Sequence, residues 1–355
     1  MKLPCITMLA TLLLTAPAAA QLQITPPATT PSAPAEKQKP KPPTTAKKEA
    51  APAPRPSASP KPSPKPAATV IPAPPSEDPN VDLVFGAYQR GQYKTAFELA
   101  TVRAQAGDPK AMTMLGELYS NAMGIRRDYA KAAEWYKRAA DAGDREAMFA
   151  LAMLRISGRG GSVDKGEAVR LMASAAKLGE PKAAYNLALL YLDGQTLPQD
   201  VKRSAELLRQ AADAGLPEAQ YALATFYKEG TGVPKDLERA VRLLQAASLA
   251  DNVDAEVEYA IAMFNGTGTP KNQPAAVALL RKASRQGSAI AQNRLAWVLI
   301  NGVGTSIDKV EGFKWHLVAK TAGKGDPELD KQLSELPAEE RAKAEAAAKK
   351  WLGTK

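Results

Sequence analysis

Apolar and small residues recur along residues 111–326 with a period of 36, and the register never slips. Each unit begins at an alanine, carries a large apolar residue four positions later, and then a small residue. The six starts are Ala111, Ala147, Ala183, Ala219, Ala255 and Ala291. Six further alanines recur late in the units, at Ala139, Ala175, Ala211, Ala247, Ala283 and Ala319. Self-similarity at such a period indicates an array of short structural repeats.

Each unit is predicted to form two helices joined by a glycine-containing loop. About eleven residues at its start place apolar side chains at helical spacing, which predicts a first helix. Gly230 and Gly232 illustrate the loop, where glycine permits the positive φ that ends a helix. An aspartate or asparagine that can cap the second helix comes next in register. These residues are Asp128, Asp164, Asp200, Asp236, Asn272 and Asp308. Because one hairpin buries too little apolar surface alone, the units are expected to stack into an all-α superhelix.

The motifs of the first unit resemble a known family. The pattern A-x-x-x-L-G-x-x-Y, then G-x-G-x-x-x-D, then A-x-x-W-Y-x-x-A-A-x-x-G stands complete or nearly so from Ala111 to Gly143 and is similar to the Sel-1-like repeat. This repeat is a 36-residue relative of the tetratricopeptide repeat. The resemblance implies a right-handed α/α superhelical solenoid of helix-turn-helix repeats. Six full units cover 111–326, residues 81–110 form a shorter leading hairpin, and 327–352 form a closing cap. The whole array spans residues 80–352.

Three loops depart from the repeat pattern. Met123-Gly124 replaces the first loop glycine of the first unit, and Gln195-Thr196 replaces the second glycine of the third. The turn at 249–252 lacks its glycine and carries Asp251 instead. We expect these changes to alter local turn geometry and to leave the fold intact.

The resemblance implies an adaptor that binds a protein or peptide on the concave wall formed by the first helices. By analogy with tetratricopeptide grooves, nine side chains are expected to face the partner. They are Phe149, Met153, Tyr185, Leu189, Tyr221, Lys228, Ile261, Phe264 and Trp297. The alternative for each of them is packing against the neighbouring first helix.

The N-terminus predicts export. Residues 1–20 combine a basic start, a short apolar stretch and Ala18-Ala19-Ala20, the pattern of a cleaved signal peptide. Residues 21–79 contain 18 prolines and a net charge of +4, which predicts a disordered linker. The linker is either a spacer or a contact to cell wall or another anionic surface. We therefore expect a periplasmic protein with no transmembrane segment after cleavage. An uncleaved anchor and a secreted protein that engages a host target are the alternatives.

Composition argues against catalysis. The 355 residues include one cysteine, Cys5, and one histidine, His316, so a disulfide framework and a zinc site built on cysteine or histidine are excluded. His316 is expected to be a packing substitution with its polar edge at the surface. No metal, cofactor or nucleic acid is expected, although the net charge is +10. The sequence predicts a non-enzymatic protein-interaction scaffold or regulator whose partner belongs to the cell envelope.

Overall fold

The computed structural model describes residues 82–353, which form sixteen α-helices and no β-strand. The predicted all-α solenoid is confirmed. The segments assigned to a signal peptide (1–20) and a linker (21–79) lie outside the described residues. The helices are α1 (Leu83–Gln89), α2 (Tyr93–Gln105), α3 (Pro109–Asn121), α4 (Tyr129–Asp141), α5 (Arg145–Ser157), α6 (Lys165–Lys177), α7 (Pro181–Asp193), α8 (Val201–Asp213), α9 (Pro217–Glu229), α10 (Leu237–Leu249), α11 (Val253–Asn265), α12 (Gln273–Arg285), α13 (Ala289–Asn301), α14 (Lys309–Thr321), α15 (Pro327–Glu335) and α16 (Ala338–Gly353).

Helices α3 to α14 form six hairpins, each with a 13-residue A helix (odd numbers) and a 13-residue B helix (even numbers). The first A helix begins at Pro109, two residues before the alanine from which the sequence register was counted. Proline is well suited to the first helical position, where its missing N–H has no helical partner. Asp108 caps this helix through a 2.9 Å bond that its carboxylate accepts from the backbone N–H of Lys110.

The recurring aspartate or asparagine caps every one of these B helices, as predicted. Asp236, for example, accepts a 2.9 Å bond from the backbone N–H of Arg239 at the start of α10. Each cap satisfies one of the helix N–H groups that have no carbonyl partner within the helix, which stabilises the hairpin by about 1 kcal/mol. The equivalent caps are Asp128, Asp164, Asp200, Asn272 and Asp308.

The three loops that depart from the repeat pattern adopt different backbone conformations. Ala122 itself adopts the left-handed conformation, with φ of 57°, where the other A helices end in glycine. Asp251 does the same with φ of 58° where the other B helices are followed by a positive-φ glycine. Thr196 does not have a positive φ, and its loop uses only Gly194, at φ of 72°.

Small residues that recur once per repeat form the core of the array, between the helices. Ala139, Ala175, Ala211, Ala247 and Ala283 have no exposed surface at all. Such columns let helix axes approach closely, and each alanine is surrounded on every side. The leucines of the A helices, among them Leu115, Leu151 and Leu187, are buried as well.

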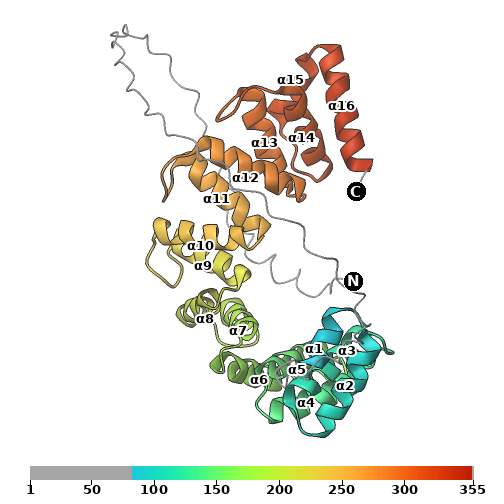
Figure 1. The fold of residues 1–355 in the computed structure, drawn as a ribbon. Coiled ribbons are helices and arrows are strands. Elements are labelled where there is room, and N and C mark those ends of the chain that lie inside the picture. The colour runs from blue at the N-terminus through green and yellow to red at the C-terminus, as the bar shows by residue number, and fades with distance from the viewer. Residues whose placement is uncertain (1–81, 354–355) are drawn as a thin grey trace, which may run out of the picture. The chain divides into compact units, whose positions relative to one another are not determined.

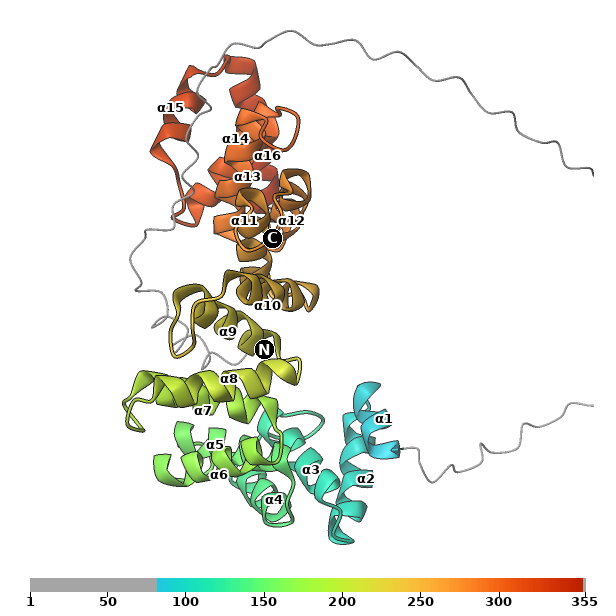
Figure 2. The ribbon, with the colours of Figure 1, turned by 90° about the vertical axis from the view of Figure 1, so that its left-hand side faces the viewer.

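Figures 1 and 2 show the hairpins following one another from α1 to α16, each stacked on the last. Consecutive A helices are joined by side chains. Tyr88 on α1 donates a 2.7 Å hydrogen bond to Glu117 on α3, and Lys228 on α9 lies 3.1 Å from Glu258 on α11. At the C-terminal end α16 packs on α14, and Trp315 meets Trp351 edge-on at 5.0 Å between ring centres. None of the helices between residues 82 and 353 is long and apolar enough to cross a membrane.

Candidate binding surface on the A helices

The A helices of the second to sixth repeats carry the nine residues expected to face a partner, and we call their exposed side the A-face. Eight of the nine are partly exposed. They are Phe149, Met153, Tyr185, Leu189, Tyr221, Lys228, Ile261 and Trp297. Phe264 differs, because it is only 5% exposed, and Ile300 at the equivalent position of the next repeat is 6% exposed. The side chains at this repeat position are buried in the last two repeats, so Phe264 is not available to a partner.

The aromatic residues of the A-face both pack and remain accessible. Phe149, Tyr185 and Tyr221 occupy the same position of three successive repeats and lean on the central core, yet each keeps part of its surface free. Met153 behaves in the same way. Core packing and partner contact are therefore compatible for these side chains, since packing holds each ring in one orientation while one side stays open.

Carboxylates lie near both tyrosines of the A-face, one near Tyr185 and three near Tyr221. Burial raises the pKa of Tyr221, and the nearby charges of Glu258, Asp254 and Glu229 raise it further. The pKa of Tyr185 is raised by burial and then by the charge of Glu218. Both phenols are neutral in the physiological range and present an O–H donor beside an apolar ring. Glu229 belongs to the polar residues that the sequence places at the C-terminal edge of this wall, whereas the sequence reasoning missed Glu218, Asp254 and Glu258.

A second polar feature lies under the A-face, in the fifth repeat. Glu256 on α11 has no exposed surface, and its Oε2 lies 2.9 Å from the Nζ atom of Lys282. Lys282 also lies 2.9 Å from Asp251, the residue with the positive φ. The equivalent residues of the neighbouring repeats are Gln220 and Gln292, which donate to the carbonyls of the preceding B helix instead. Gln292 donates to Ser284 at 3.1 Å, and Gln220 to Ala212 at 3.3 Å.

His316 is a packing residue, as predicted, but the expectation that its polar edge lies at the surface was wrong. Its ring is fully buried, and Nε2 lies 2.8 Å from Oδ1 of Asp330 on α15. Lys320 lies 2.7 Å from the same oxygen, so the cluster ties α15 to α14. The polar edge is not at the surface because the closing helices cover the end of the array, which the comparison of repeat columns could not anticipate.

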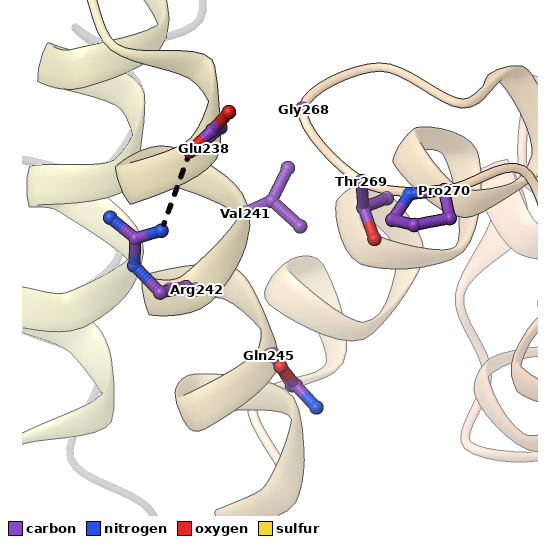
Figure 3. A pocket seen from close by; sticks show the side chains of 7 residues that line it. All are labelled: Glu238, Val241, Arg242, Gln245, Gly268, Thr269 and Pro270. Atoms are coloured by element: carbon purple, nitrogen blue, oxygen red, sulfur yellow. Dashed lines mark ion pairs between the residues drawn. The ribbon is translucent and has the colours of Figure 1, made fainter.

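An open depression lies away from the A-face, between α10 and the loop before α12 (Figure 3). Its volume is about 490 Å³, and it is lined by Glu238, Val241, Arg242, Gln245, Gly268, Thr269 and Pro270. Glu238 and Arg242 pair with each other at 3.8 Å across one turn of α10. The depression therefore offers no free charge to a ligand. No group of three or more His, Cys, Asp or Glu residues within 82–353 is arranged to hold a metal ion.

Comparison with known proteins settles the family. The model of the Sel1 repeat matches six consecutive segments, 109–144, 145–180, 181–216, 217–252, 253–288 and 289–324. The chain belongs to the Sel1 repeat family. Each matched segment is one A–B hairpin of the structure together with the turn that follows it. Sel1 repeat proteins generally act as non-catalytic scaffolds for protein–protein interaction, and this array is built as they are.

Solved structures agree with this assignment. A Sel1 repeat protein from Oxalobacter formigenes is 27% identical with a TM-score of 0.61, and the match covers 67% of this chain and 98% of that one. A protective antigen of uropathogenic Escherichia coli strains, which displays the same fold, is 24% identical with a TM-score of 0.52. That match covers 73% of this chain and 64% of the antigen, and it supports the fold alone. No curated protein matches the sequence.

Proposed function

We propose that this Sel1 repeat protein is a non-enzymatic scaffold that binds a protein of the cell envelope through its A-face. The observation that carries the proposal is the row of partly exposed apolar rings on successive A helices, Phe149, Tyr185 and Tyr221. Large apolar side chains held open on a repeat surface are suited to an amphipathic or extended peptide. Their fixed packing lowers the entropy lost when a partner binds.

The proposed compartment is the periplasm. It rests on the sequence of residues 1–20, whose charged start, apolar stretch and small-residue end are typical of an exported protein. The Lys- and Pro-rich residues 21–79 are proposed to act as a spacer, with contact to an anionic surface as the alternative. Secretion with a host target remains the alternative to an envelope partner. Recovery of the folded chain from culture medium, with none in the periplasmic fraction, would favour it.

In-cell photo-crosslinking tests the proposed surface. A photoreactive residue replaces Leu189, which is partly exposed beside Tyr185 on α7. We expect one dominant envelope protein in the adduct, and its loss when Tyr185→Ala and Trp297→Ala are combined. The matched control is Leu178→Ala with Leu249→Ala, because these apolar side chains are 49% and 81% exposed at the C-terminal ends of the B helices α6 and α10.

Circular dichroism first establishes that each chain keeps its helical content, since the rings of Tyr185 and Trp297 also contribute to packing. Equal adduct yields from the A-face variant and the control would rule out binding through the A-face. A yield lost only in the A-face variant supports it, and mass spectrometry of the adduct then names the partner.

A further inference from the structure

The charged side chains of the A-face are not evenly distributed. Helices α9 and α11 carry, apart from the buried Glu256, four carboxylates and a single lysine. The lysine, Lys228, is engaged by Glu258 at 3.1 Å. Glu218, Glu229 and Asp254 are exposed and form no ion pair within residues 82–353. The A helices of the fourth and fifth repeats therefore present an excess of negative charge beside the ring of Tyr221.

The A helices on either side of α9 and α11 each carry a basic residue. Lys182 lies on α7, and Arg294 lies on α13. The pKa of Arg294 is lowered by burial, while the charges of Asp326 and Glu258 act in the opposite direction. Arg294 is thus partly compensated by neighbours already present. Lys182 is exposed on the same helix as Tyr185 and forms no ion pair within residues 82–353, so the excess of negative charge is confined to α9 and α11, around Tyr221.

We propose that the occupant of the A-face is an extended, cationic segment of a partner protein, which places Lys or Arg against the carboxylates of α9 and α11 and apolar residues against the open rings. This inference rests on the proposed function and adds the chemical class of the partner. The rings provide apolar contact and cation–π partners, and the carboxylates of α9 and α11 select positive charge. An anionic partner would meet Glu218, Glu229 and Asp254 without compensation and is disfavoured.

Three synthetic peptides test the inference on the full chain by fluorescence anisotropy. Each has four triplets, Leu-Pro-Lys, Leu-Pro-Gln or Leu-Pro-Glu, so that only the charge changes. We expect the lysine peptide to bind at least about tenfold more tightly than the glutamine peptide at low salt, and the preference to shrink as salt is raised. The glutamate peptide should not bind measurably.

Two double variants test whether the carboxylates of α9 and α11 cause the preference for the lysine peptide. Glu218→Gln with Asp254→Asn should weaken the lysine peptide about tenfold and leave the glutamine peptide unchanged, since two exposed charge contacts are removed. The matched control is Glu134→Gln with Asp213→Asn, which removes the same charge from exposed positions on the B helices α4 and α8. The control should leave all three affinities as they were.

Equal affinity for the three peptides, or an equal loss in the control, would overturn the cationic inference. Self-association of the chain that competes with the peptide would assign the A-face to a second copy and also overturn it. The same variants in the photo-crosslinking experiment separate the two proposals. An adduct lost with the ring substitutions and kept with the carboxylate substitutions would leave the A-face function standing and refute the partner's charge. An adduct kept with both would refute the function itself.

Discussion

Two glycines of one loop should differ in importance, and the difference measures how tightly successive repeats are coupled. Gly230 and Gly232 both have positive φ, 83° and 67°. A Cβ atom at Gly230 would meet its nearest neighbour, the Cβ of Lys235, at 3.4 Å, which is ordinary contact. A Cβ atom at Gly232 would lie 2.6 Å from the carbonyl oxygen of Val201, the first residue of α8 in the preceding repeat.

The two substitutions to alanine therefore carry different penalties. Each places an L-residue in the left-handed region, which costs about 1–2 kcal/mol and is offset by roughly 0.4–1 kcal/mol through the stiffer unfolded chain. Gly230→Ala should thus lower the free energy of unfolding by about 1 kcal/mol. Gly232→Ala adds an overpacking term of about 1–3 kcal/mol, because backbone must move away from backbone. Its total is about 2–4 kcal/mol.

The displaced contact joins two repeats, so the form of the unfolding transition should change too. In a repeat array, stability is a sum of unit terms and nearest-neighbour interface terms. Weakening the interface between the third and fourth repeats should broaden the transition and lower the apparent m-value. Gly230→Ala should shift the midpoint and leave the slope as it is.

Urea unfolding followed by circular dichroism measures both quantities in the two variants and the parent chain. Gly143→Ala is a further control, since its φ is 88° and a Cβ atom there would have nothing within 4 Å. We expect Gly143→Ala to match Gly230→Ala. Equal midpoints for the Gly230 and Gly232 variants would refute the reasoning, because the approach of the loop to Val201 would then contribute nothing to the coupling of repeats.

Three further substitutions test the polar and strained positions. Lys282→Met should destabilise the chain by about 2 kcal/mol, because it leaves the carboxylate of Glu256 buried without its cation. In a Glu256→Gln background the same change should be nearly neutral. A double-mutant cycle of urea midpoints measures the difference. Ala122→Gly should raise the free energy of unfolding by about 0.5–1 kcal/mol by relieving its positive φ, and a lower melting temperature would contradict this. Asp330→Asn concerns pH: hydrogen bonds from Lys320 and then His316 lower the pKa of Asp330. The ionised carboxylate of Asp330 stabilises the folded chain fully above its pKa in the unfolded chain, about 3.9, and this stabilisation is lost as pH falls through its lower pKa in the folded chain. The melting temperatures of the parent and of Asp330→Asn should therefore converge only below about pH 3.9.

The binding surface shows where reasoning from the sequence stops. The register nominated nine side chains, and eight of them are partly exposed, because position within an A helix is set by the helical period; their contact with a partner stays a prediction. It failed for Phe264, since the same column is open in the early repeats and closed in the later ones. Exposure depends on how the next hairpin packs, and no periodicity within one unit contains that information.

The amino-acid sequence by itself determined the fold class, the 36-residue unit and the capping residues of the B helices. These features are local: a glycine ends a helix and an aspartate begins one through contacts a few residues away. Only the tertiary structure decided which polar residues are buried and what they meet. Glu256 meets Lys282, and His316 meets Asp330, across 26 and 14 residues of chain. Such pairings arise where helices pack on one another, and the free energy of burial, not helix propensity, selects them.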